Sequence, residues 1–224
     1  MKKVDKLINQ LRERVKEYFK SDASGHNIDH LNRTLNYALY LQKNEGGDEI
    51  VVGLSAFLHD IHRIMGAELN RWVHPKESLP VVSKFLEDLP ITKKQKEHIL
   101  YAIEHHEEYA FGSQGVSVTD IESKILQDAD NLDAIGASGI VRTFKYGWAH
   151  NHKEYDENIP LYQETGYDEA KDEPSTIHHI NNKLIRLGKY MNTKTARELA
   201  KNKTKLMKQF VKMFIDEYTG NFDN

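Results

Sequence analysis

The 224-residue sequence contains no cysteine, which excludes disulfide bonds and thiolate ligands for a metal ion. Any metal centre in this protein must therefore use nitrogen and oxygen ligands. A reducing compartment suits a chain without cysteine, so we expect a cytoplasmic protein. Proline occurs only five times, and no proline-rich linker, internal repeat or low-complexity tract divides the chain. A single domain over residues 1–224 is the simplest interpretation.

Long apolar runs and a strong charge imbalance are also missing. No segment is expected to reach transmembrane length and no N-terminal apolar run suggests secretion, so we expect no association with a membrane. The formal net charge of −3 lacks the basic excess that is typical of a dedicated nucleic-acid binder. The sequence has no Gly-x-Ser-x-Gly motif and no glycine-rich phosphate loop ending in Lys-Ser or Lys-Thr. An acyl-type nucleophile and a P-loop therefore have no support.

What the sequence does have is helical periodicity. Apolar residues recur at three- and four-residue spacing, which predicts an all-α fold in the form of a single helical bundle. Asp48 is a plausible N-cap, and Thr92 and Gln95 fit a capping box. Segments 63–75 and 151–174 are predicted as loops, and the second is a candidate lid. The predicted helices cover approximately residues 4–19, 26–44, 48–61, 76–87, 92–108 and 121–135, with two more that begin near residues 175 and 193.

Two adjacent polar residues, His59 and Asp60, lie near the end of the apolar segment 51–61. This segment is expected to form a helix that is buried on most sides. A histidine and an aspartate in such a helix are costly unless something pairs with them. The two side chains either satisfy each other by a hydrogen bond in the core or hold one metal ion together, and the pair alone leaves both interpretations open.

An upstream stripe of polar residues favours the metal ion. His26, His30, Arg33 and Tyr37 recur at spacings of four, three and four residues, which places them on one side of a helix. Beside the core edge, such a stripe could reach a buried anionic site. Its alternative interpretation is an ordinary solvated helix face.

A downstream carboxylate also favours the metal ion. Asp128 lies in the middle of an apolar helical stripe, where an unpaired charge needs a cation such as a metal ion, Arg or Lys. Asp130 projects from the opposite face and is expected at the surface, and Asp133 lies well off the stripe. Asp128 is therefore the candidate site residue of this segment. The apolar stripe consists of Ile121, Ile125, Leu132 and Ile135.

Two consecutive histidines, His105 and His106, end the helix that is predicted to begin near Thr92. His106 falls on the apolar side of that helix. The two imidazoles could form a second ligand set, relay a proton or contact phosphate, or they could simply be a polar helix end.

Taken together, His30, the pair His59-Asp60 and Asp128 match the H…HD…D pattern of the HD-domain metal-dependent phosphohydrolases. The sequence resembles the YpgQ/YedJ-type branch of this family in particular. The resemblance runs from about residue 20 to residue 215, which implies an HD domain with its core in that range.

Three segments carry the resemblance to this branch. Residues 26–33 resemble its H-D-x-x-H-x-x-R motif, with Asn27 in place of the usual aspartate. Residues 126–137 are similar to the signature L-Q-D-A-D-x-L-D-A-I-G-A. Residues 175–184 are similar to S-T-I-x-H-F-x-x-K-L, with Ile180 where phenylalanine is common.

The resemblance implies a divalent metal ion held by His30, His59, Asp60 and Asp128. Two nitrogen and at least two oxygen ligands suit an octahedral ion, most simply Mn²⁺, with Mg²⁺, Fe²⁺, Co²⁺ or Ni²⁺ as alternatives. Zinc usually prefers four ligands. Because the ligands come from three predicted helices, the ion would also hold those helices together.

A phosphate substrate would need cationic hydrogen-bond donors. Arg33 is favoured because it lies one turn from His30 and a guanidinium matches phosphate geometry. The candidates for substrate binding are Arg33, His26, Lys183, which the resemblance adds, and Lys145. The catalytic candidates are Asp60, His105 and His106, with the histidines as proton relays. Each basic residue could instead be an ordinary surface charge.

The activity implied by the resemblance is hydrolysis of nucleoside or deoxynucleoside triphosphates to a monophosphate and pyrophosphate. The alternatives are a phosphodiesterase or 5′-nucleotidase of the same superfamily, and a nucleotide sensor that keeps the metal without turnover. A second metal ion at His105, His106, Glu107 and His74 is a minority alternative to a single ion. The expected partner is a nucleotide or another phosphate ester, and exposed aromatic residues suggest a homodimer.

Overall fold

The computed structural model describes residues 3–20, 25–108, 118–161 and 174–222. Every regular element within these ranges is a helix, which confirms the predicted all-α fold. The elements in chain order are α1 (Lys3–Tyr18), α2 (Ile28–Glu45), α3 (Glu49–Leu58), α4 (Ile61–Leu69), α5 (Pro75–Leu86), α6 (Lys93–Glu104), α7 (Ile121–Ala134), α8 (Gly136–Ala149), α10 (Thr176–His179), the π-helix η1 (Ile180–Leu184), α11 (Ile185–Leu187) and α12 (Lys194–Thr219).

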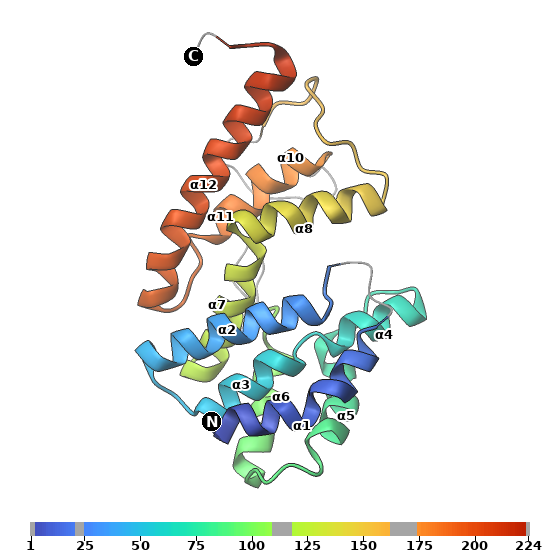
Figure 1. The fold of residues 1–224 in the computed structure, drawn as a ribbon, viewed down its shortest axis with the longest axis vertical. Coiled ribbons are helices and arrows are strands. Elements are labelled where there is room, and N and C mark those ends of the chain that lie inside the picture. The colour runs from blue at the N-terminus through green and yellow to red at the C-terminus, as the bar shows by residue number, and fades with distance from the viewer. Residues whose placement is uncertain (1–2, 21–24, 109–117, 162–173, 223–224) are drawn as a thin grey trace.

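The helices form a lower and an upper part that α7 connects (Figure 1). In the lower part, α3 packs against α1, α2, α6 and α7. In the upper part, α12 packs against α8, η1 and α11. Because α7 packs against α2 and α3 as well as against α8 and α12, it has neighbours on several sides. This central position of α7 decides which of its polar residues face the site.

The core helix α3 is buried along its whole length from Ile50 to Leu58. Asp48 caps it as predicted, since its carboxylate accepts hydrogen bonds from the backbone N–H of Ile50 (2.8 Å) and of the next residue (3.3 Å). The helix ends at Leu58, so His59 and Asp60 lie in the turn between α3 and α4 rather than inside a helix as predicted. Both side chains are nevertheless buried.

By length and composition alone, Glu49–Leu69 is long and apolar enough to cross a membrane, contrary to the expectation that no segment reaches that length. However, 78% of its most apolar window is buried inside the protein. The apolar window therefore belongs to the core.

Two loop predictions need correction. Much of segment 63–75 belongs to α4, which ends where Asn70 adopts a left-handed conformation (φ 50°). Gly66 lies inside α4 and does not interrupt it, so only residues 70–74 lie outside the helices. For segment 151–174, residues 151–161 lie outside regular elements as predicted, whereas residues 162–173, and with them much of the candidate lid, fall outside the described part of the chain.

The corner between α7 and α8 is tight. Gly136 turns the chain with a positive φ of 80°. A Cβ atom on Gly139 would come within 2.1 Å of the carbonyl oxygen of Ala134, so the start of α8 lies directly against the end of α7. As a result, α8 passes over α7, and Arg142 can donate a hydrogen bond to Asp133 (2.7 Å).

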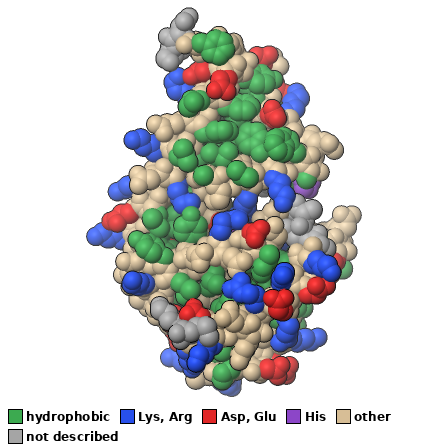
Figure 2. Space-filling view, viewed as in Figure 1, with side chains coloured by type: hydrophobic (Ala, Val, Ile, Leu, Met, Phe, Trp, Pro, Cys, Tyr) green, Lys and Arg blue, Asp and Glu red, His purple; other side chains and the backbone are tan. Residues whose placement is uncertain are grey.

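The upper part carries an exposed apolar surface over α8 and α12 (Figure 2). The helix starts predicted near residues 175 and 193 are confirmed, since Ser175 caps α10 and Thr193 caps α12. A homodimer stays a prediction, and this surface is where two copies could meet. Its exposed members are Val141, Trp148, Leu206, Met213 and Tyr218.

Candidate metal centre

Two buried histidines meet where α2 passes the end of α3. The Nε2 atoms of His30 and His59 are 3.2 Å apart. The other ring nitrogen of each is engaged: His30 Nδ1 donates to Asp133 (2.8 Å) and His59 Nδ1 donates to the carbonyl oxygen of Ala56 (3.0 Å). Since these oxygens can only accept, the neutral rings carry their proton on Nδ1, and both Nε2 lone pairs face the same point. Histidines that bind metal ions are oriented in this way.

Two carboxylates complete the group. Asp60 Oδ2 lies 3.0 Å from His30 Nε2 and 3.5 Å from His59 Nε2. Asp130 Oδ1 lies 3.5 Å and 3.7 Å from the same two atoms. His30, His59, Asp60 and Asp130 are called the His–Asp cluster below. They come from α2, the α3–α4 turn and α7. His30, His59 and Asp130 form one group of possible metal ligands, and Asp60 belongs to two further groups that share His30 or His59.

A further residue, the buried His106, adjoins the cluster. Its Nδ1 donates to the carbonyl oxygen of Ile103 (2.7 Å), and its ring lies 5.1 Å from that of His59. Its buried Nε2 has no hydrogen-bond partner within the described ranges. A buried nitrogen without a partner costs free energy, and an ion or a water molecule held by an ion removes that cost. The donor set therefore fits a divalent metal ion.

The charges at the cluster also fit a cation. Burial acts to raise the pKa of Asp60, but the nearby His59 and His26 outweigh it and hold the pKa well below its usual range. Burial opposes ionisation of Asp130 too, yet its interactions with His59 keep the pKa low. Burial acts to lower the pKa of His59, but the two carboxylates raise it to about 9. A proton on His59 thus balances the carboxylates, and a metal ion would compete with it.

Asp133 orients the cluster from behind. This buried carboxylate accepts hydrogen bonds from Arg33 Nε (2.7 Å) and Nη2 (3.0 Å), from Arg142 Nη1 (2.7 Å) and from His30 Nδ1. Burial would raise the pKa of Asp133, but these partners hold it well below its usual range. Asp133 therefore fixes the ring of His30, and Arg33, predicted to bind phosphate, donates two of its N–H groups to this carboxylate.

Asp128, the fourth predicted ligand, is buried but faces a different neighbour. Its carboxylate accepts hydrogen bonds from Asn192 N (2.7 Å), Thr193 N (2.8 Å) and the Thr193 hydroxyl (2.7 Å). Asp128 thus holds the turn before α12. Asp130, expected at the surface, has a side chain only 25% exposed and takes the place assigned to Asp128.

The prediction confused Asp128 with Asp130 because α7 is surrounded by other helices. A single apolar stripe locates the core only when a helix has one buried face, whereas α7 is buried from Ser123 to Asp133 at nearly every position. A better signal was present in the sequence. Asp130 and Asp133 are three residues apart, so they share the face of α7 that packs against α2.

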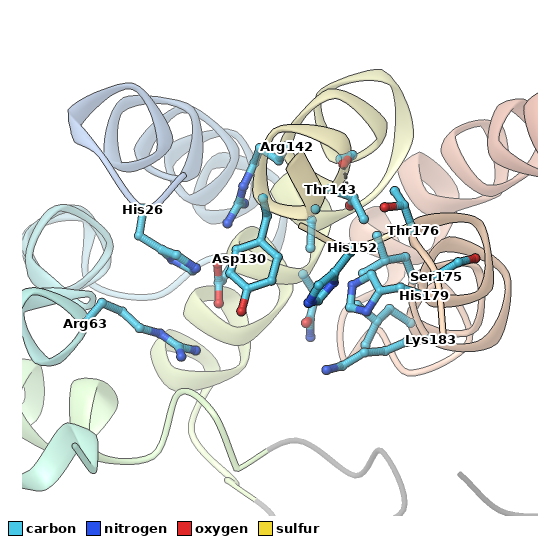
Figure 3. Close-up of a pocket in the computed structure, with 17 residues that line it drawn as sticks. His26, Arg63, Asp130, Arg142, Thr143, His152, Ser175, Thr176, His179 and Lys183 are labelled. Atoms are coloured by element: carbon cyan, nitrogen blue, oxygen red, sulfur yellow. Dashed lines mark hydrogen bonds between the residues drawn. The ribbon is translucent and has the colours of Figure 1, made fainter. Parts of the chain in front are cut away.

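A cavity of about 290 Å³ opens beside the cluster, with Asp130 in its wall. Figure 3 shows basic side chains on opposite sides of this space, His26 and Arg63 on one side and Lys183 on the other. Arg63 also pairs with Glu107. This space is called the cationic cavity below. Its basic lining residues are His26, Arg63, Arg142, His152, His179 and Lys183.

The remaining predicted residues divide into two groups. His26 lines the cavity and its Nδ1 lies 2.6 Å from Asp60 Oδ2, and Lys183 lines the opposite wall. Lys145 is exposed on α8 and is not among the residues that line the cavity. His105 lies against Tyr101 and 3.0 Å from Glu108, so the structure does not bring it into the cluster.

For a second metal ion, the structure offers a different set of ligands from the one that the sequence predicted. His74 caps α5 by accepting a hydrogen bond from Lys76 N (3.0 Å), so the structure does not bring it to this site. Its place is taken by His62, whose Nε2 lies 3.3 Å from Glu107 Oε1 and whose ring lies 5.3 Å from that of His106.

Removal of a bound metal ion by EDTA is expected to lower the melting temperature by roughly 5–15 °C, because the ion connects α2, the α3–α4 turn and α7. Calorimetry before and after chelation, with Mn²⁺ added back, measures the change. Elemental analysis of the same preparation should give one equivalent per chain. Saturation at two equivalents would favour a second ion at His62, His106 and Glu107, and an unchanged melting temperature without bound metal would contradict the site.

Similarity to known proteins agrees with this geometry. A family model described as the HD domain matches residues 27–135. The uncharacterized protein YpgQ of Bacillus subtilis (strain 168) is 31% identical over 215 residues, covering 96% of this chain and 95% of that protein. An HD-superfamily hydrolase from Bacillus thuringiensis superimposes with a TM-score of 0.72 at 31% identity, covering 96% and 98%. Bacillus subtilis YpgQ in complex with ADP superimposes with a TM-score of 0.70 at 28% identity, covering 99% of each chain.

Proposed function

Because the chain belongs to the HD domain family, we propose that it hydrolyses nucleoside or deoxynucleoside triphosphates to a monophosphate and pyrophosphate in a reaction that depends on a divalent metal ion. The observation that carries this proposal is that Asp130 of the His–Asp cluster lies in the wall of the cationic cavity. A cation site beside a cavity with several basic side chains suits a substrate with several negative charges.

The metal-binding residues in this proposal are His30, His59, Asp60 and Asp130. Their nitrogen and oxygen atoms favour an octahedral ion, and Mn²⁺ is the one we propose. Such an ion, when bound, offsets phosphoryl charge and makes water a better nucleophile. His26 holds Asp60 in position through the contact between its Nδ1 and Asp60 Oδ2 (2.6 Å).

The basic residues of the cationic cavity hold the phosphate chain. Arg142 uses Nη1 for Asp133, but a guanidinium has five N–H donors, so others remain for phosphate. Lys183 approaches from the opposite wall, on the π-helix η1 (Figure 3). Cationic donors thus lie on two opposite walls of the cavity, and this arrangement favours a polyphosphate over a single phosphate group. The complex of YpgQ with ADP supports a nucleotide as the substrate class.

Purified protein with added Mn²⁺ is expected to convert a nucleoside triphosphate to equal amounts of monophosphate and pyrophosphate, with no orthophosphate. Phosphorus NMR of the products tests this, with the Asp60→Asn variant as the inactive control. Activity on cyclic nucleotides or 5′-monophosphates would favour the phosphodiesterase or nucleotidase alternative. Tight binding with recovery of intact nucleotide would favour a sensor, and equal product release by wild type and variant would contradict the proposal.

A further inference from the structure

A second groove, of about 460 Å³, lies next to the cationic cavity. The two spaces share His26, Arg63 and Tyr146, so they meet at these residues. The remaining wall of the groove comes from α4, from the segment that follows it, including Asn70 and Trp72, and from His150 at the end of α8. This second space is called the Trp72 groove below. Its lining also includes basic residues, but it differs from that of the cationic cavity by the exposed indole of Trp72.

Trp72 is an exposed aromatic residue on a well-held turn. Its side chain is 64% exposed, while its neighbour Val73 is buried and anchors the segment. Arg71 donates a hydrogen bond to the carbonyl oxygen of Trp72 (2.9 Å) and pairs with Glu77 (2.6 Å). The indole contacts the ring of His74 in an edge arrangement with ring centroids 5.5 Å apart. An ordered turn therefore presents a large aromatic side chain to solvent, and exposure of apolar area costs free energy.

A second aromatic pair lines the same groove. Tyr146 is 43% exposed and stacks on His150, with ring centroids 4.0 Å apart and an angle of 25° between the planes. Asn70 adds an amide, which offers both a donor and an acceptor. Exposed aromatic faces beside an amide match a nucleobase, which has two π faces and a polar edge.

We propose that the Trp72 groove binds the nucleobase of the substrate by stacking on Trp72, while the phosphate chain lies in the cationic cavity. This inference rests on the proposed function. Because His26 and Arg63 line both spaces, and His26 contacts Asp60, the phosphate next to the nucleoside lies at the His–Asp cluster. The β- and γ-phosphates then extend toward Arg142 and Lys183.

This orientation of the substrate determines which bond breaks. The oxygen of water forms a bond to the α-phosphorus, and the bond between that phosphorus and the oxygen bridging to the β-phosphorus breaks. Pyrophosphate leaves with the bridging oxygen on the side of Arg142 and Lys183. The nucleoside monophosphate stays on the side of Trp72, and one proton from water is released to solvent.

The Trp72→Leu variant is expected to bind ADP about 10-fold more weakly than the wild type and to bind pyrophosphate equally well. Calorimetric titration of Mn²⁺-loaded protein measures both dissociation constants. Trp148→Leu is the matched control, because Trp148 is also 64% exposed and is not among the residues that line either space. It should leave both constants unchanged. Melting temperatures verify that both variants fold.

Fluorescence gives a second readout. The chain has two tryptophans, so Trp72 is the only indole in the Trp148→Leu variant, and ADP should quench its emission while pyrophosphate does not. Equal ADP affinity in Trp72→Leu and the wild type, equal weakening of ADP and pyrophosphate, or unquenched emission would each overturn the inference. Selective weakening of ADP in a protein without turnover would support the groove and contradict the proposed hydrolysis.

Discussion

The Asp130→Asn variant is expected to lose most of its divalent metal and to hydrolyse nucleotides roughly 100-fold more slowly than the wild type, or more slowly still. Asp130 Oδ1 lies 3.5 Å from His30 Nε2 and 3.7 Å from His59 Nε2, at the wall of the cationic cavity. A neutral amide at this position no longer offsets the charge of a cation. Elemental analysis and initial rates with Mn²⁺ measure the two effects.

The Asp128→Asn variant is the matched control, because it makes the same change two residues away. We expect it to keep the metal and the activity at temperatures well below its melting point. Its stability should fall by about 1–3 kcal/mol, because an amide NH₂ faces the backbone N–H groups that Asp128 now accepts from. If Asp128→Asn lost the metal and Asp130→Asn kept it, the assignment made from the structure would be reversed.

Of the single substitutions proposed here, Asp133→Asn is expected to destabilise the protein most. Its free energy of unfolding should be lower than that of the wild type by about 3–5 kcal/mol. The buried carboxylate accepts hydrogen bonds from Arg33, Arg142 and His30, and an amide leaves two guanidinium groups without their counter-charge. Urea unfolding in the presence of EDTA measures this effect separately from any loss of metal.

Arg33→Gln is the control for this prediction. The side chain of Arg33 is 36% exposed, and Arg142 still pairs with Asp133 after the change. The loss should be about 1 kcal/mol, as for other partly exposed ion pairs. Asp133→Asn should also weaken metal binding roughly 10- to 100-fold, because the ring of His30 loses its orienting partner. If Asp133→Asn lost less stability than Arg33→Gln, Asp133 would have no central role in holding these helices together.

Local features of the site were predictable from the sequence. His59 and Asp60 follow an apolar run and are buried, and His30 lies on the neighbouring helix with its ring directed at them. Asp48 and Thr92 cap their helices as their positions predicted. Each of these inferences needs only the period of a helix or the chemistry of its first turn, and both are set by residues a few positions apart.

The sequence could not predict in the same way which carboxylate each basic side chain pairs with. Arg33 has the spacing of a substrate-binding residue, yet it pairs with Asp133, 100 positions further along the chain. Arg63 and Arg142 line the cationic cavity although each also pairs with a carboxylate, and the sequence pattern predicted neither of them as a site residue. A basic side chain binds the nearest unpaired carboxylate, and the nearest one is known only when the helices have been packed together.

The sequence by itself therefore determined an all-α chain with a buried His-Asp pair and a second histidine beside it, and it limited the ligands of any metal ion to nitrogen and oxygen atoms. Only the tertiary structure decided between Asp128 and Asp130, because α7 is enclosed by α2 and α3 on one side and by α12 on another. The period of a helix states which residues share a face. It does not state which helix that face meets, since packing between helices distant in the chain decides this.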